Sequence, residues 1–426
     1  MRFFRHLFAI MALAIIGVAA GLSPAGEAGP PPADEVRRLV ARLGSASKAD
    51  REAAEESLGS HGPVILAELL RLTAACAGEV RLRLDRVIAR FEAELVERAT
   101  EPAIVSLSVE KMPVRDVLSR IARDSGNPLM VSDEVEHGLA GTRPVSLSLD
   151  RATYWEAVQE ALLRGGLEID FRDDGRRVVV VPAAGRRVAR VAAGPLLVVV
   201  SGVETGRATP DGRSVRVGLK LAWEPRIVPL VVRLPMDSVQ VEGPRGESVP
   251  PSSRRGVLEA TVLPGAAWLP LTIPLLAKDP LPDSLASVRA TVRLWCAGGE
   301  HDFSMPLEPL PAEARQRVGR AEVSFRAERR DRGQVAVDAE VVYDAPSEPL
   351  ESHRMWLVDR ELVVVGPAGD LLPAASHRVR HRSDRGLAVT DEFVLDHKAG
   401  GGSVRWRLPA AVREVPIDVN LRDVAW

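Results

Sequence analysis

Two histidines in one short basic segment are the first residues whose spacing suggests chemistry. His377 and His381 stand four positions apart. On a helix, histidines at i and i+4 lie on one face and can share a zinc ion. The surrounding sequence is typical of β-strands, in which positions i and i+4 lie about 13 Å apart. We therefore expect two surface histidines and no metal site.

Two groups of aspartates raise the question of paired carboxylates. Asp173 and Asp174 form one group, and Asp279 and Asp283 form the other. A glycosidase needs two acids held at a defined separation across a cleft. Both groups are flanked by Gly or Pro, which favour turns. We expect turns at both places and no catalytic pair.

Nucleophilic chemistry finds little support in the sequence. It contains no Gly-x-Ser-x-Gly, no His-Glu-x-x-His and no phosphate-binding Gly loop. The two cysteines, Cys76 and Cys296, fall in different predicted domains, and neither has a neighbouring His. We expect two buried free thiols. A disulfide between them, and an active site assembled from dispersed residues, stay open as alternatives.

Six of the seven tryptophans fall in the β-rich C-terminal part of the chain. Trp223 and Trp295 occupy the apolar positions of alternating strands, so we expect them in a core. Trp268 and Trp356 stand near the ends of predicted strands. Exposed aromatic side chains often anchor partners, and these two tryptophans are therefore our candidate surface contacts for a protein or a sugar.

The densest positive stretch runs from Arg315 to Arg332, but acidic residues are interleaved with its arginines. Interleaved charge is typical of a solvated surface. The whole chain has a formal net charge of -2, whereas nucleic-acid binding calls for a strongly basic face. We expect no nucleic-acid partner.

The N-terminus is typical of a secretory signal. Arg2 and Arg5 precede an apolar stretch of 16 residues, Leu7–Leu22, which is short for a membrane span. Small residues at 18–20 suit cleavage, so we predict a signal peptide at 1–20 and a Pro- and Gly-rich linker at 21–33. We expect an exported, periplasmic or envelope-associated protein with no integral membrane span after cleavage. An uncleaved anchor is the alternative.

Residues 34–100 show helical periodicity. Val36, Leu39, Val40 and Leu43 lie 3, 4 and 7 positions apart, the spacing of one helical face, and three further amphipathic segments follow. Short helices joined by short turns, with Arg51-Glu-Ala-Ala opening the second, resemble HEAT-type repeats. A generic four-helix cap is the alternative to a HEAT-like domain.

The middle of the chain, 102–182, contains one phrase written twice. Val105-Ser-Leu-Ser-Val recurs 40 residues later as Val145-Ser-Leu-Ser-Leu, and each copy continues into an amphipathic helix that ends at Gly126 or Gly166. The alternation predicts strands with one buried face. The predicted order is β-α-β twice and then a last strand, with both helices on one face of a small sheet.

These residues resemble the secretin and TonB short N-terminal (STN) domain. The resemblance rests on the doubled phrase, on Pro113-Val-Arg-Asp-Val-Leu, and on Ala157-Val-Gln-Glu-Ala-Leu-Leu before Gly166-Leu-Glu-Ile. It implies a periplasmic domain that binds partner proteins. The residues that follow do not resemble the pore or transporter domains of those families, so we expect docking and not transport. A free sheet edge would accept a partner strand by β-augmentation.

From residue 195 onward the sequence predicts strands and turns without long helices, which favours β-sandwiches. We predict two tandem immunoglobulin-like sandwiches, at 195–310 and 320–426, joined by a linker at 313–319. Three segments recur between them. Residues 215–223 match 335–343, 239–247 match 362–370, and 288–294 match 415–421, at offsets of 120, 123 and 127.

The sequence as a whole resembles an exported bacterial multidomain protein. We predict a non-enzymatic protein-interaction or scaffold protein of the cell envelope, with no cofactor. Two alternatives stay open. One is a carbohydrate-binding protein or hydrolase with a site between the sandwiches and the middle domain, and the other is a sensor ectodomain.

Overall fold

The computed structural model describes residues 32–73, 75–185, 188–210, 212–263, 265–278, 281–297, 300–308, 310, 313–318, 321–330, 333–343, 357–358, 360–367, 369–395, 402–409 and 412–425. The predicted signal peptide therefore lies outside the described residues. The chain is multidomain and rich in β structure, with several sheets and few helices. It divides into two compact units, Met1–Val87 and Ile88–Trp426. No helix among the described residues is both long and apolar enough to span a bilayer.

The N-terminal segment is helical, as its periodicity predicts. Val36 and Val40 are buried on one face of its first helix, and Ser47 caps the second by accepting a hydrogen bond from Asp50 N at 3.3 Å. The boundary between the two compact units falls within the last helix. The elements are α1 (Ala33–Arg42), α2 (Lys48–Ser60), the 3-10 turn η1 (Gly62–Ile65), α3 (Leu66–Thr73) and α4 (Gly78–Thr100).

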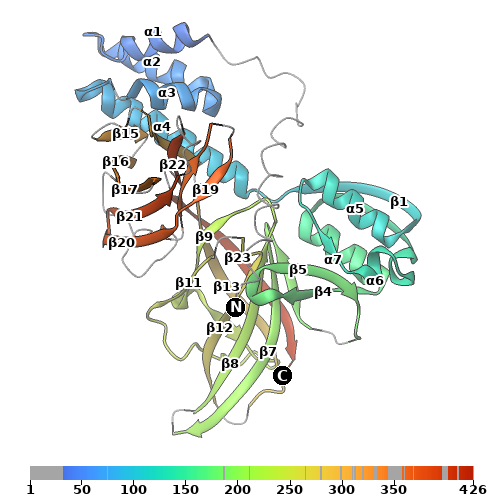
Figure 1. Cartoon of the computed structure of the whole chain (residues 1–426). Coiled ribbons are helices and arrows are strands. Elements are labelled where there is room, and N and C mark those ends of the chain that lie inside the picture. The colour runs from blue at the N-terminus through green and yellow to red at the C-terminus, as the bar shows by residue number, and fades with distance from the viewer. Residues whose placement is uncertain are drawn as a thin grey trace. The chain divides into compact units, whose positions relative to one another are not determined.

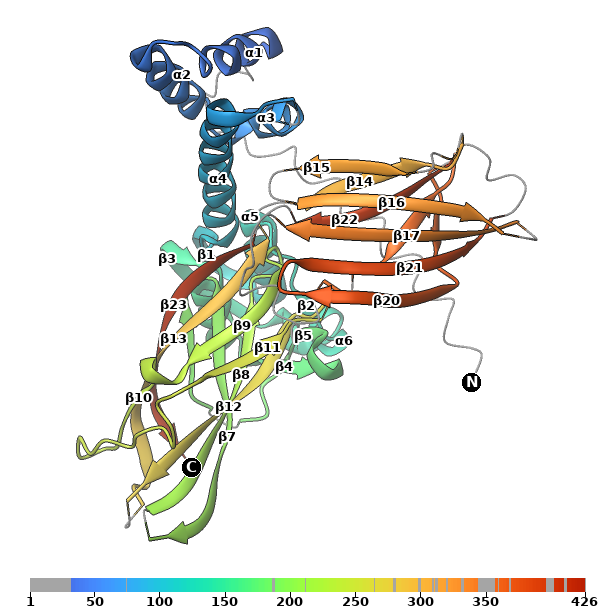
Figure 2. The ribbon, with the colours of Figure 1, turned by 90° about the vertical axis from the view of Figure 1, so that its left-hand side faces the viewer.

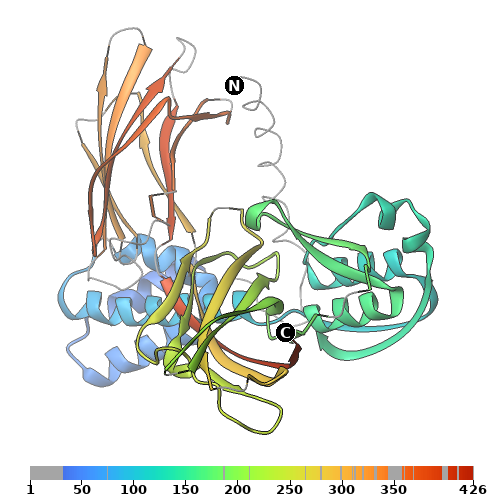
Figure 3. The same ribbon diagram turned by 90° about the horizontal axis from the view of Figure 1, so that it is seen from below.

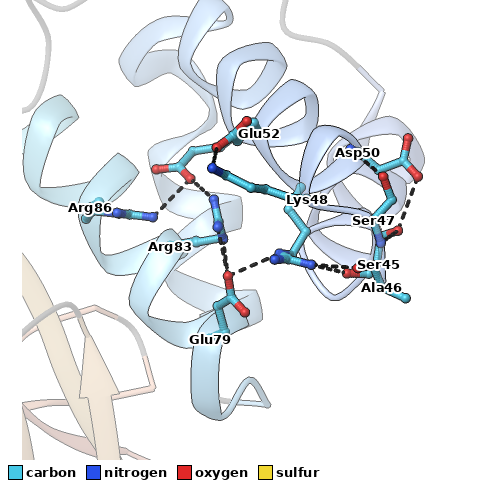
Figure 4. Close-up of polar contacts among 11 residues, drawn as sticks. Ser45, Ala46, Ser47, Lys48, Asp50, Glu52, Glu79, Arg83 and Arg86 are labelled. Atoms are coloured by element: carbon cyan, nitrogen blue, oxygen red, sulfur yellow. Dashed lines mark hydrogen bonds and ion pairs between the residues drawn. The ribbon is translucent and has the colours of Figure 1, made fainter.

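Alternating charges join α2 to the start of α4. The side chain of Arg83 is only 11% exposed and contacts Glu55 at 2.6 Å and Glu79 at 2.7 Å (Figure 4). Arg51 also contacts Glu79, at 3.1 Å, and Arg86 contacts Glu55 at 3.1 Å. A shared network of partly buried ion pairs stabilises a helix contact more than an isolated surface pair does.

The middle unit consists of two small sheets and their helices (Figure 1). One sheet pairs β1 with β3, and the other has the order β2-β5-β4. Both long helices bury an apolar face, so α5 and α7 share one core with the strands. The elements are β1 (Ile104–Pro113), α5 (Val114–Ser125), β2 (Met130–Val131), α6 (Asp133–Glu136), η2 (Leu139–Thr142), β3 (Pro144–Thr153), α7 (Tyr154–Gly165), β4 (Leu167–Arg172), η3 (Asp173–Gly175) and β5 (Arg177–Pro182).

The two copies of the repeated phrase pair with each other, because β1 and β3 are antiparallel neighbours. Each strand contains a bulge at which one residue has positive φ, Lys111 at 48° and Arg151 at 50°. Lys111 N donates to Ser146 Oγ and Arg151 N donates to Ser106 Oγ, both at 3.0 Å. The first serine of each phrase therefore satisfies the bulged backbone of the other copy.

The first β unit has two sheets with a core between them. One sheet has the order β12-β8-β7-β6, and the other contains β11, β9, β13, β10 and β23. Val198, Val217 and Ile273 from the first sheet meet Val232 and Val292 from the second. The elements are β6 (Arg190–Ala193), β7 (Leu196–Thr209), β8 (Gly212–Trp223), β9 (Pro229–Pro235), η4 (Met236–Ser238), β10 (Gln240–Glu242), β11 (Val257–Thr261), β12 (Trp268–Ala277), β13 (Ser284–Ala297) and β23 (Val412–Ala425).

The second β unit also has two sheets. Their orders are β14-β22-β18-β19 and β15-β16-β17-β21-β20, and Figure 2 shows the strands of the latter side by side. Phe303, Phe325, Phe393 and Trp406 are fully buried in its core. The elements are β14 (Glu300–Pro306), β15 (Ala314–Val318), β16 (Ala321–Arg329), β17 (Gln334–Tyr343), β18 (Leu362–Val365), β19 (Leu371–Pro373), β20 (Ser376–Ser383), β21 (Gly386–Val394) and β22 (Ser403–Pro409).

The last strand lies in a different sheet from the one that we predicted. We assigned 412–425 to the second sandwich, but β23 pairs with β13 of the first β unit over the whole length of β13 (Figures 2 and 3). Conversely, β14, which we placed in the first sandwich, pairs with β22. Strand alternation predicts a strand and its buried face, but it does not specify which distant strand becomes the neighbour.

The segment between the two β units forms a strand, and one type of turn occurs in both units. The predicted linker at 313–319 is wrong, because Ala314–Val318 forms β15 and pairs with β16. The Gly-Pro-x-Gly segments that begin at Gly243 and Gly366 both form turns. Gly243 N bonds to Glu247 O and Gly366 N bonds to Asp370 O, both at 2.8 Å, so the two turns share one geometry.

Candidate binding site

The unpaired side of β4 is the feature around which a binding site can be built. β4 pairs with β5 on one side, and among the described residues no strand pairs with its other side. Ser132 N donates to Val180 O at 2.9 Å, so the backbone of Val180 is directed toward β2. Ile169 stands opposite Val180 across the β4–β5 pair. The backbone N–H and C=O of Ile169 are therefore directed away from β5.

A second hydrogen bond confirms this alternation. Ala183 N donates to Gly166 O at 3.0 Å, so position 166 faces β5. Since successive residues of a strand direct their backbone groups to opposite sides, Glu168 faces β5, whereas Ile169 and Phe171 face outward. Such a row of outward N–H and C=O groups is a template for another strand.

A hollow of about 550 Å³ adjoins this edge. Its lining is mainly aliphatic and comes from α7, β4, β7 and the segment after β5. Leu163 on α7 is 68% exposed, although α7 buries most of its other apolar side chains. Among its described lining residues, Glu168 and Arg190 carry the charges. The lining residues are Leu162, Leu163, Gly166, Leu167, Glu168, Ile169, Ala183, Gly185, Val188, Arg190, Leu197 and Val199.

β7 forms one wall of the hollow, and both faces of this strand are packed against other side chains. Leu196 and Val198 point into the core of the first β unit, whereas Leu197 and Val199 belong to the core of the middle unit. A strand buried on both faces is held in a fixed position by close packing. The hollow is therefore bounded by a rigid element.

Trp268 packs against the end of β4 that leads into the η3 turn. Our prediction that Trp268 is a surface contact is therefore wrong. Its side chain is 8% exposed and belongs to the core of the middle unit. Its ring meets Phe171 edge-on at 5.2 Å, and Nε1 donates to Arg172 O at 3.3 Å. Lys220 Nζ lies 5.2 Å from the ring centroid. Trp268 thus positions β4 and is not free to contact a partner.

A buried glutamate fastens the first copy of the repeat. Glu224 is fully buried and accepts hydrogen bonds from Ala103 N at 2.9 Å, Asn127 Nδ2 at 2.9 Å and Arg226 Nε at 2.8 Å. Asn127 is also fully buried, and its Oδ1 accepts from Arg226 N at 3.2 Å. A buried carboxylate is tolerated only when its charge and lone pairs are satisfied, and here they are.

Burial near Glu224 raises the pKa of Tyr154. Tyr154, the first residue of α7, is fully buried and its hydroxyl has no hydrogen-bond partner among the described residues. Burial is the main reason that the pKa of Tyr154 lies far above its ordinary value, and the charge of Glu224 raises it further. The hydroxyl stays protonated at neutral pH and has no reactive character.

The two histidines are exposed residues of a strand, as predicted, and that strand is at the edge of its sheet. Both belong to β20, and His377 Nδ1 lies 2.6 Å from Asp391 Oδ1. Asp391 is fully buried, and that burial raises the pKa of its carboxyl, although His377 opposes the shift. The contact ties β20 to β21. No group of three or more potential metal ligands occurs in the described parts of the chain.

The structure describes three of the four grouped aspartates, Asp173, Asp174 and Asp283. Asp173 and Asp174 form the predicted turn, both with positive φ. A hydrogen bond from Arg177 holds the pKa of Asp173 below its ordinary value. Asp283 lies in a bend, and Asp279 lies outside the described residues.

Trp223, Trp295 and Cys296 are buried. Trp223 and Trp295 are 3% and 2% exposed, which confirms their core positions. Both cysteines are free thiols; Cys296 is buried as predicted, whereas Cys76 is only half-buried. Burial raises the pKa of Cys296 to about 12. Trp356, the other candidate surface contact, lies outside the described residues.

Sequence reasoning missed Leu163, which lines the hollow, and also Asn127 and Glu224, which anchor the first copy of the repeat. Leu163 gave a weak signal, because it adds a second leucine beside Leu162 at the end of an amphipathic helix. Asn127, directly after the helix-ending Gly126, was another signal, since a polar residue there replaces the leucine of the second copy. Glu224 gave none, because its partners lie about 100 residues away in sequence.

Comparison with known proteins adds little. No family model matches the chain, and no curated protein matches it. One similar solved structure is described as the crystal structure of the conserved domain protein from Bacillus anthracis. It is 9% identical, with a TM-score of 0.15, over 55% of this chain and 89% of that chain. A likeness of that size carries no argument about function.

Proposed function

We propose that this chain is an exported, non-enzymatic protein-interaction or scaffold protein of a bacterial cell envelope. Its middle unit receives an extended segment of a partner protein, which adds as a strand to the outer side of β4. The observation that carries the proposal is the unpaired edge at Ile169, beside the aliphatic hollow. Edge hydrogen bonds supply affinity in this mode, and adjoining pockets supply specificity.

The same geometry supports a proposal for the chemistry of the partner segment. An added strand presents alternate side chains to the same face. The hollow lines that face with Leu163, Leu167 and Val188, so the segment carries apolar residues at every second position. Glu168 and Arg190 at the rim favour opposite charges on the intervening residues.

We also propose a fold family for each part of the chain. We take the middle unit as an STN-like domain, because two strand-helix copies pair through reciprocal serine contacts and resemble that family in sequence. We take the four helices as HEAT-like and both β units as immunoglobulin-like. The signal-like N-terminus supports export.

The hollow is a poor match to the hydrolase alternative. Its described lining residues include one carboxylate, Glu168, whereas acid-catalysed glycoside hydrolysis requires two. The sensor alternative depends on a membrane link. Sequencing the N-terminus of the exported protein tests that point, since a mature start near Gly21 supports a released protein and an intact N-terminus supports an anchor.

Capture of partners from an envelope extract tests the proposal. The baits are the wild type, Leu163→Asp and the matched control Leu139→Asp, which places the same charge at an 89% exposed leucine outside the hollow. We expect a protein that the wild type and Leu139→Asp recover and that Leu163→Asp loses. Recovery of the same proteins by all three baits, or of none by the wild type, contradicts the proposal.

A further inference from the structure

A second hollow, of about 650 Å³, lies on the outer face of the first β unit. It is lined from β9, β13, β23 and the loop that precedes β11. Its described lining residues include four arginines, two from strands and two from the loop, and two acids. The arginines are Arg233, Arg254, Arg255 and Arg293, and the acids are Asp237 and Glu414.

The two strand arginines stand directly opposite each other. Arg233 on β9 is the register partner of Arg293 on β13, a placement that costs free energy because like charges repel across a strand pair. Glu414 lies between them, 3.2 Å from Arg233 Nη1 and 2.8 Å from Arg293 Nη1. It also accepts a hydrogen bond from Trp295 Nε1 at 2.8 Å. The floor of the hollow therefore already binds one carboxylate, which belongs to the chain itself.

That floor is rigid. The guanidinium of Arg233 lies over the ring of Trp295, 4.5 Å from its centroid, and is 14% exposed. Its Nε also lies 3.3 Å from Glu259 on β11. A stacked and doubly paired guanidinium keeps a fixed orientation. Arg293, in contrast, is 42% exposed and faces the open part of the hollow.

The loop arginines are positioned but have no acidic partner. Ser253 Oγ accepts from Arg255 N and donates to Arg255 O, both at 3.1 Å, and Met236 N donates to Gly256 O at 3.1 Å. The loop backbone is thus tied to the unit. Within the described residues, the side chains of Arg254 and Arg255 form no ion pair, and both are exposed at the mouth of the hollow.

We propose that this hollow binds a small ligand through an oxyanion group, a phosphate, sulfate or carboxylate. Arg254, Arg255 and the open side of Arg293 contact the anion, and Arg233 with Glu414 forms the floor. Guanidinium groups bind such oxyanions with charge-assisted, often bidentate hydrogen bonds. The volume suits a small molecule. This site is separate from the edge of β4 and does not rest on the proposed function.

Calorimetric titration with inorganic phosphate, sulfate and citrate tests the site and separates tetrahedral anions from carboxylates. The test variant is Arg254→Gln with Arg255→Gln. The matched control, Arg216→Gln with Arg422→Gln, removes the same charge from exposed positions of the same unit. We expect the best of the three anions to lose affinity at least about tenfold in the test variant and to keep it in the control.

A third variant excludes a purely structural explanation. Glu414→Gln removes the internal carboxylate and frees Arg293, so it should tighten binding of the same anion, provided that circular dichroism shows a folded protein. If it does not fold, the comparison of the two arginine variants decides alone. Absence of binding by all three anions, or equal losses in both double variants, overturns the proposal.

Discussion

The two copies of the repeated phrase fold alike up to the end of their helices and differ beyond it. Both helices end at a glycine with φ of 68°, Gly126 and Gly166. After Gly126 comes β2, which has two residues. After Gly166 comes β4, which has six residues and, beside a hollow, one side that no described strand pairs with. A two-residue edge strand offers little to a partner, whereas a six-residue edge offers a template.

The two copies also contact the first β unit through different kinds of interaction. Asn127, after Gly126, is a buried polar residue bonded to Glu224. Its equivalent after Gly166 is Leu167, which is buried among apolar side chains. The same local signal for strand, helix and glycine therefore leads to a hydrogen-bonded anchor in one copy and an apolar wall in the other.

The largest expected effect comes from proline in the two edge strands. Ile169→Pro removes an outward N–H that β5 does not use, so we expect stability to fall by only about 1 kcal/mol. Partner affinity should fall about 100-fold, since the added strand loses a hydrogen bond and meets the ring.

The matched control is Val131→Pro in the first copy. Val131 also faces outward, because its neighbour Ser132 bonds to Val180. Binding of the captured partner to each variant, measured by biolayer interferometry, checks the difference. Equal losses in the two variants would show that β4 has no special role.

The next largest effect concerns the polar anchor of the first copy. Glu224→Ala leaves Asn127 Nδ2 and Ala103 N without their acceptor and breaks the pair with Arg226, so unfolding in urea should be easier by about 3–5 kcal/mol. Glu242→Ala, which breaks a surface pair with Arg289, should cost less than about 1 kcal/mol. Similar losses for both variants would rule out Glu224 as an anchor.

A smaller effect tests the symmetry of the copies. Ser106→Ala and Ser146→Ala each remove one exposed hydrogen bond to the bulge of the other strand, and each should cost about 0.5 kcal/mol. Ser108→Ala removes a serine that faces its own counterpart, Ser148, and should cost nothing measurable. Urea unfolding of the three variants checks this. A cost at Ser106 several times that at Ser146 contradicts the reciprocal arrangement.

The smallest effect on stability at neutral pH concerns Tyr154, the first residue of α7, which corresponds to Val114 of α5. Tyr154→Phe removes a buried hydroxyl without a partner, so stability should be unchanged or rise by about 1 kcal/mol. Because the folded pKa of Tyr154 lies above its ordinary value, its contribution to stability is complete below about pH 10 and falls as the pH rises further.

Absorbance of the tyrosinate checks this titration. The chain has two tyrosines, and burial also raises the pKa of Tyr343. We expect no tyrosinate signal in the folded protein until it unfolds in alkali. Reversible ionisation near pH 10 in the folded state would show that Tyr154 or Tyr343 is exposed, and its persistence in Tyr343→Phe would assign it to Tyr154.

Local elements of this fold could be predicted from the sequence, and distant pairings could not. The spacing of Val36 and Val40 and the alternation at Val105 depend on neighbouring residues alone, and the structure has the predicted helix and strand. The partner of β23 depends on a strand more than 100 residues away. Our prediction for Trp268 was wrong for the same reason. Phe171, which packs against its ring, belongs to the middle unit, whereas Trp268 belongs to the first β unit. The edge of β4 became a candidate only once its neighbours were known.

Hydrogen exchange at the amides of β4 tests the central claim most directly. In the free protein, Ile169 and Phe171 should exchange fast, whereas Glu168 and Asp170, which face β5, should exchange slowly. Addition of the captured partner should protect Ile169 and Phe171 and leave Val131 unchanged. Fast exchange at Ile169 with the partner bound, or protection already present without it, would contradict strand addition at β4.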